Sequence, residues 1–132
     1  MHPRTNISAG AAGGRYLAAL DTGEVIDRFN AAFNAHEVDA VMALMTEDVV
    51  FESTLPAPDG QRYEGQAAVR AYWEEFFASS PPDSFTGEET IVTGDRAVVR
   101  WVFDWGTGHV RGVDVMKVRD GKVAEKFSYV KG

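Results

Sequence analysis

The sequence predicts a single α+β domain, with helices in the first half of the chain and an antiparallel sheet in the second half. Apolar residues recur at helical spacing up to residue 79, and from residue 85 onward the period changes to two. Short turns rich in Gly and Asp separate four β-rich runs, which are residues 86–93, 96–105, 109–119 and 122–130. Tight turns between consecutive strands make these strands antiparallel, and the helices are expected to pack on one face of the sheet.

Three helical patterns occupy the first half of the chain. Asp21 and Glu24 have the spacing of a capping box, in which each side chain accepts a hydrogen bond from the other residue's backbone. The helix that they start has an apolar face formed by Val25, Ile26, Phe29 and Phe33. A shorter helix is expected over residues 38–45 and a third over residues 66–79, with a short strand at residues 49–51 (VVF) between them.

Length and composition are those of one folded domain. The chain has 132 residues, of which 45% are hydrophobic and 25% are charged, and this is ordinary globular usage. Residues 1–20 are mostly small and lack a clear period, so we expect a flexible N-terminal tail there. The folded domain is then expected over residues 21–132.

The charge balance disfavours two classes of partner. The formal net charge is −7 at pH 7, so the surface repels phosphate backbones and anionic lipids, and we expect neither a nucleic-acid nor a membrane partner. The absence of cysteine excludes disulfides and thiolate catalysis. The sequence has no apolar run of membrane-spanning length and no secretory signal pattern, and the expected location is the cytoplasm.

Three segments of the chain carry a family resemblance. Residues 28–53 (RFNAAFNAHEVDAVMALMTEDVVFES) look like the opening of ketosteroid isomerases, and residues 63–73 (YEGQAAVRAYW) resemble the start of their third helix. Residues 114–123 (DVMKVRDGKV) are similar to the last hairpin of these isomerases and of SnoaL-like polyketide cyclases. The chain therefore resembles the nuclear-transport-factor-2-like superfamily, on its SnoaL-like and ketosteroid isomerase-like branch. The resemblance implies a cone, in which three N-terminal helices and a strongly curved antiparallel sheet enclose a pocket.

Asp114 is the candidate catalytic residue. It lies mid-strand between Val113 and Val115, where an aspartate is unfavourable unless it has a function. By resemblance it matches the inward acid of the isomerases and the general acid/base of the cyclases. An apolar cavity would favour its neutral form and let it exchange a proton. The alternative is a surface aspartate paired with Arg100 or Arg111.

The rest of the isomerase site is missing from the sequence. Phe29 stands where the family has its oxyanion tyrosine, and Ser53 stands where it has the carboxylate base. Glu52 is adjacent to Ser53, but strand alternation points it to the opposite face unless the register slips by one residue. Steroid isomerisation by the familiar acid-plus-base mechanism is therefore not expected.

Further residues are expected to line the pocket. Trp101, Phe103 and Trp105 alternate along one face of a strand and form an aromatic stripe. Such a stripe either lines the cavity or packs the convex face of the sheet against a second subunit, and we favour the second, which turns Arg100 and Asp104 toward the pocket. Lys126 and Ser128 share a strand face beside Asp114, where Lys126 is either a cation at the pocket edge or, as is commoner for lysine, a surface residue. The expected pocket residues besides Asp114 are Phe29, Ser53, Val69, Trp73, Arg100, Asp104 and Ser128.

Two functions remain open from the sequence. The first is a cofactor-free isomerase, cyclase or lyase that acts by acid–base chemistry on a hydrophobic carbonyl compound. The second is a non-catalytic domain of the same fold that binds a hydrophobic ligand or serves in assembly. In both cases the expected partners are a small hydrophobic molecule and a second copy of the chain, and neither a cofactor nor a metal site is expected.

Overall fold

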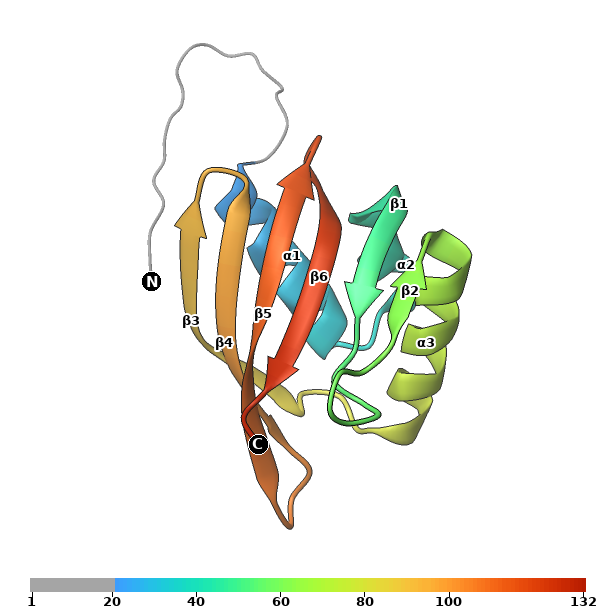
Figure 1. Cartoon of the computed structure of the whole chain (residues 1–132), viewed down its shortest axis with the longest axis vertical. Helices are drawn as coiled ribbons and strands as arrows, with labels where there is room; N and C mark the ends of the chain where they lie inside the picture. Colours follow the sequence, from blue (N-terminus) through green and yellow to red (C-terminus); the bar gives the residue numbers. More distant parts are fainter. Residues whose placement is uncertain (1–20) are drawn as a thin grey trace.

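The computed structural model describes residues 21–132, and the expected tail over residues 1–20 lies outside this described part. These described residues form three helices and six strands in an α+β arrangement (Figure 1). The helices are α1 (Thr22–Asn34), α2 (Val38–Ala43) and α3 (Gln66–Ser79). The strands are β1 (Met45–Glu52), β2 (Arg62–Glu64), β3 (Phe85–Thr93), β4 (Arg96–Asp104), β5 (His109–Arg119) and β6 (Lys122–Val130).

The predicted capping box fixes the start of α1. The Asp21 side chain accepts a hydrogen bond from the Glu24 backbone N–H at 2.8 Å, and the Glu24 side chain accepts one from the Asp21 N–H at 3.2 Å. These bonds satisfy N–H groups that the first helical turn leaves without partners. The buried face of α1 contains the apolar residues expected from the sequence.

The sheet is mixed, which corrects the expectation of a wholly antiparallel sheet. Its strand order is β2-β1-β6-β5-β4-β3, and β1 pairs with β6 in parallel, whereas the other neighbouring strands are antiparallel. The parallel pair is possible because β1 is far from β6 in sequence, so that no tight turn connects them. Strand β2 was not predicted because it follows a Pro-rich segment and is only three residues long.

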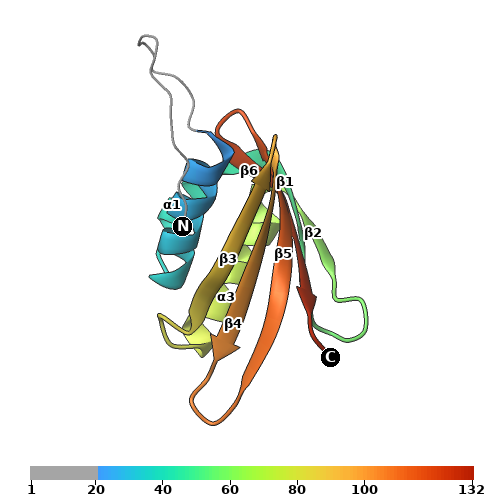
Figure 2. The ribbon, with the colours of Figure 1, turned by 90° about the vertical axis from the view of Figure 1, so that its left-hand side faces the viewer.

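The helices lie on one side of the sheet, and no described helix covers its other face (Figure 2). The buried core lies between these two layers and contains side chains from α1, α2 and α3 and from the inner face of the strands. None of the described helices is long and apolar enough to span a membrane.

Candidate functional site

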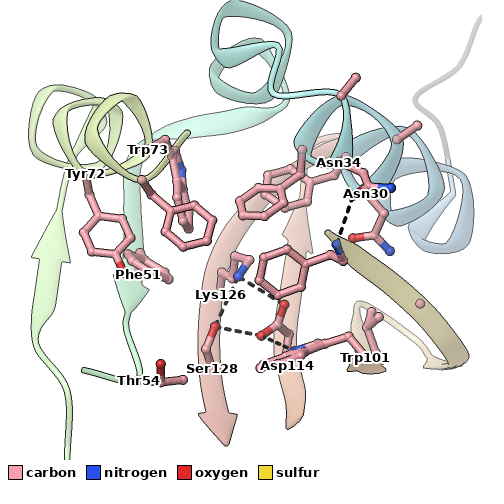
Figure 3. A pocket seen from close by; sticks show the side chains of 18 of the residues that line it. Asn30, Asn34, Phe51, Thr54, Tyr72, Trp73, Trp101, Asp114, Lys126 and Ser128 are labelled. Carbon is pink, nitrogen blue, oxygen red and sulfur yellow. Dashed lines mark hydrogen bonds and ion pairs between the residues drawn. The ribbon is translucent and has the colours of Figure 1, made fainter. Parts of the chain in front are cut away.

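A cavity lies between α1, α3 and the inner face of the sheet (Figure 3). Its volume of about 350 Å³ is within the range of small-molecule sites. Eight of its nineteen lining residues are aromatic, and polar groups lie at its floor and rim. The aromatic lining residues are Phe29, Phe33, Phe51, Tyr72, Trp73, Phe76, Phe85 and Trp101.

Asp114 forms part of this cavity, as expected from the sequence. Alternation along β5 buries Asp114 and Met116 on the inner face. Asp114 is only 7% exposed, and its carboxylate accepts two hydrogen bonds at Oδ1. Trp101 Nε1 donates one of them at 3.0 Å, and Ser128 Oγ donates the other at 2.7 Å.

Lys126 is the buried partner of Asp114. Its Nζ lies 3.1 Å from Asp114 Oδ2 and donates to Ser128 Oγ at 3.1 Å, and the residue is 6% exposed. Register explains the cluster, because Ser128 pairs with Asp114 across β5 and β6, and Lys126 lies two residues away on the same face of β6. The ammonium group is also 5.2–5.3 Å from the ring centroids of Phe33, Phe51 and Trp73. Cation–π attraction thus adds to the ion pair.

These contacts revise the expected chemistry of the acid. Trp101, Ser128 and Lys126 all donate hydrogen to Asp114, and an ionised carboxylate is the form that only accepts. From the sequence we expected a neutral acid in an apolar cavity. A buried cation and two hydrogen-bond donors instead fit the charged form, because they offset the cost of taking a carboxylate out of water.

Trp101 lines the cavity and Phe103 packs against Phe76 of α3, so these two residues of the aromatic stripe lie on the helix side of the sheet, and their assignment to a dimer face is wrong. Trp105 follows β4 and is 47% exposed. Trp101 pairs with Gly87 on β3 and with Gly112 on β5, and the indole lies against Gly112. A Cβ atom added to Gly112 would lie 2.5 Å from Trp101 Cζ2. The missing side chain at Gly112 therefore gives the indole the space from which its N–H reaches Asp114.

Because Trp101 and Phe103 point inward, the residues that alternate with them on β4 point outward, and Arg100 and Asp104 do not line the cavity. Both are exposed residues on the other face of β4. Arg100 forms an ion pair with Glu89 at 3.1 Å, and Asp104 accepts a hydrogen bond from the Gly106 backbone at 2.8 Å.

The other predicted lining residues divide into two groups. Phe29, Trp73 and Ser128 line the cavity as expected. Val69 is fully buried in the core cluster and is not part of the cavity wall. Ser53 is also buried away from the cavity, since its hydroxyl donates to the Leu55 carbonyl at 2.8 Å and accepts from the Gln61 N–H at 3.0 Å.

Glu52 is not a pocket acid either. It pairs with Arg62 of β2 at 3.0 Å, so the register slip that would turn it inward does not occur. The neighbouring inward residue of β1 is Phe51, which lines the cavity. Neither carboxylate nor hydroxyl from this end of β1 therefore replaces the isomerase base.

The polar groups at the cavity rim were not predicted from the sequence. Asn30 and Asn34 are four residues apart on α1 and thus share a helix face, a spacing that could have indicated them. Thr54 follows β1, and Tyr72 comes from α3. Burial raises the pKa of the Tyr72 phenol, so its hydroxyl stays protonated at neutral pH and keeps a hydrogen to donate.

Comparison with known proteins supports the architecture. The chain shares 43% identity with a nuclear-transport-factor-2-like protein of unknown function from Mesorhizobium loti, with a TM-score of 0.73 over 84% of this chain and 91% of that one. A candidate ketosteroid isomerase from Kribbella flavida is 21% identical, with a TM-score of 0.72 over 84% and 78% of the two chains. A candidate polyketide cyclase from Sinorhizobium meliloti is 22% identical, with a TM-score of 0.64 over 80% and 93%.

No curated protein matches the chain. The family model of the SnoaL-like domain matches residues 26–126, which is most of the described part and includes both Asp114 and Lys126. The chain therefore belongs to the SnoaL-like domain family, with the nuclear-transport-factor-2-like fold.

Proposed function

We propose that the protein is an enzyme that moves a proton on a small hydrophobic carbonyl compound, with Asp114 as the proton-transferring group. The observation that carries this proposal is the Asp114–Lys126 pair, because both charged groups are nine-tenths buried and both line an otherwise aromatic cavity. Buried charges that face a pocket are typical of groups kept for chemistry rather than for stability.

The contacts favour one oxygen of Asp114 as the base. Oδ1 accepts hydrogen bonds from both Trp101 and Ser128, whereas the only described donor to Oδ2 is Lys126. A carboxylate oxygen can accept two hydrogens, so Oδ2 keeps one position for a proton from carbon. The nearby Lys126 ammonium would stabilise the negative charge that develops on the carbonyl oxygen as this proton leaves.

The reaction class is an isomerase-, cyclase- or lyase-like proton transfer without a cofactor. The candidate isomerase and cyclase among the similar structures support this class by fold alone, since both are below 25% identity. The site lacks the oxyanion tyrosine of the steroid isomerases, for which it has Phe29, and Ser53 lies outside the cavity. We therefore propose that steroid Δ5–Δ4 isomerisation is not its reaction.

Exchange of carbon-bound hydrogen tests the proposal without knowledge of the natural substrate. Acetophenone and indanone are incubated with the protein in deuterium oxide, and loss of the α-proton signal is followed by proton NMR. We expect exchange that Asp114→Asn slows by at least about a hundredfold. Asp120→Asn makes the same chemical change in the exposed turn between β5 and β6 and should leave the exchange rate unchanged. Equal rates for wild type and Asp114→Asn would contradict the role of Asp114.

A second candidate function is ligand binding without catalysis. It is favoured by the same hydrogen bonds, because three internal donors already occupy the Asp114 carboxylate and could make it a structural group. In that case both ketones bind in the cavity, as detected by ligand-observed NMR, and no exchange above the protein-free rate occurs.

We also propose that the chain forms a homodimer through the outer face of the sheet rather than through the aromatic stripe. The face without a described helix carries Val98, Val115 and Phe127, which are paired neighbours on β4, β5 and β6, and the exposed Tyr129. Sedimentation should give twice the chain mass, and Phe127→Lys should reduce it to the chain mass. A monomer at all concentrations would contradict this proposal.

A further inference from the structure

Lys126 is a primary amine at the floor of the cavity, a place where lysine is rare. The proposed function uses its charge and leaves its nitrogen without a chemical role. We infer that Lys126 captures small aromatic or conjugated aldehydes and ketones as a covalent imine. This inference rests on the proposed function in one respect, namely that carbonyl compounds enter this cavity.

The surroundings of the amine fit a nucleophile. A lysine nitrogen attacks a carbonyl carbon only when it is neutral, so a nucleophilic lysine needs a neighbouring group that can take its proton. The acceptor is Asp114 Oδ2, 3.1 Å from Nζ. The three rings of Phe33, Phe51 and Trp73 surround the nitrogen at 5.2–5.3 Å. A bound apolar compound would displace water from this site, which disfavours the ion pair relative to the neutral acid and amine.

Capture needs no reagent beyond the two residues and the carbonyl compound. The Lys126 ammonium gives a proton to Asp114 Oδ2, and the neutral amine forms a C–N bond with the carbonyl carbon. The carbonyl oxygen takes the proton back from Asp114 and becomes a hydroxyl group. A second proton passes from nitrogen by way of Asp114 to this hydroxyl, which leaves as water. The nitrogen then gives its third proton to Asp114, so that the products are a neutral imine, one water and a neutral Asp114. Atoms and charge balance, because the ion pair is also neutral overall, and no redox change occurs.

The cavity also selects the class of compound. A volume of about 350 Å³ with an aromatic wall favours a flat, apolar body of one or two rings. The amides of Asn30 and Asn34 and the hydroxyl of Thr54 can hydrogen-bond polar substituents at the rim. Figure 3 shows Asn30 and Asn34 on one side of the Asp114–Lys126 pair and Thr54 on the other.

Reductive trapping tests this inference. Benzaldehyde is first shown to bind by ligand-observed NMR, and the protein is then treated with benzaldehyde and cyanoborohydride, which reduces an imine to a stable benzyl amine. Peptide mapping by mass spectrometry measures the labelling rate of each lysine in the same sample. We expect Lys126 to be labelled at least about tenfold faster than the surface residues Lys117 and Lys122, because a bound carbonyl is held next to its nitrogen. Lys126→Arg keeps the charge but cannot form the imine, and it should abolish the pocket label while the surface labels remain.

A Lys126 that is buried but does not form an imine would reverse the order of the labelling rates. If Lys126 only serves as an ion-pair partner, it is the least accessible of these three lysines and becomes the slowest to be labelled. That result, or absence of benzaldehyde binding, overturns the inference. Persistence of Asp114-dependent hydrogen exchange in acetophenone alongside an unlabelled Lys126 would overturn the covalent step and leave the proposed function standing.

Discussion

The Asp114→Asn substitution distinguishes two descriptions of Asp114, as a member of a buried ion pair or as an isolated acid in the pocket. Asparagine has nearly the same shape as aspartate, and its carbonyl oxygen can still accept from Trp101 and Ser128. It has no charge, so the change removes the counter-ion of Lys126. The amide N–H₂ group also faces the Lys126 ammonium, where two donors now meet.

The size of the effect follows from burial. The side chains of Asp114 and Lys126 are 10% and 8% exposed, so solvent screens their interaction little. Removing one partner of such a pair leaves an uncompensated buried charge and costs about 3–5 kcal/mol. This is a large share of the roughly 5–15 kcal/mol that stabilises a domain of this kind. An acid without a cation would show the reverse, since loss of its charge would be neutral or stabilising.

Urea unfolding at pH 7, followed by tryptophan fluorescence and far-UV circular dichroism, measures the loss. The matched control Asp120→Asn lies in an exposed turn and should change the free energy of unfolding by less than about 0.5 kcal/mol. The double variant Asp114→Asn/Lys126→Met should recover much of the loss, because it leaves no unpaired charge. A stability equal to or above wild type for Asp114→Asn alone would refute the ion-pair account.

Two further predictions concern packing and pH. Gly112→Ala should lower the free energy of unfolding by about 1–3 kcal/mol, because its methyl group would lie 2.3 Å from the Tyr129 carbonyl oxygen and 2.5 Å from Trp101 Cζ2. Gly87→Ala, whose methyl group meets nothing within 4 Å, should be nearly neutral in the same urea experiment. The hydrogen bond from Arg119 lowers the pKa of the Asp48 carboxyl, so the stability that this pair contributes is present above the pKa of the unfolded chain and is lost as the pH falls through the folded value. Asp48→Asn should therefore lower the melting temperature at pH 7, and the difference from wild type should vanish in acid; an equal difference at both pH values would contradict this assignment.

Sequence periodicity predicted the elements well where local signals are strong. The bounds of α3, β5 and β6 agree with those expected, because proline, Asp-Gly and Gly-rich turns end each of them. The parallel pairing of β1 with β6 could not be predicted in this way, since it joins strands that are far apart in sequence. Local patterns carry no information on such a pairing.

The site was predicted only in part, because the sequence did not show which face of β4 points into the cavity. Alternation shows which residues share a face of one strand, but both faces of β4 carry apolar residues, and composition does not decide which of them points inward. The hairpin register decides it, because Asp114 pairs with Val99, and Trp101 lies two residues further along the same face. An inward Asp114 thus required an inward Trp101. The burial of Lys126 depends on the rings packed around it, which no local pattern shows.

The most direct test of the pocket account is to observe the two cavity tryptophans while a carbonyl compound binds. The chain has three tryptophans, of which Trp73 and Trp101 line the cavity and Trp105 is 47% exposed outside its wall. Acetophenone is titrated into nitrogen-15-labelled protein, and the Trp101 indole signal is assigned by its shift in Asp114→Asn. We expect the Trp73 and Trp101 signals to move together and saturate while the Trp105 signal stays in place. A Trp101 signal that does not move, or a shift confined to Trp105, would show that carbonyl compounds do not reach the Asp114–Lys126 pair.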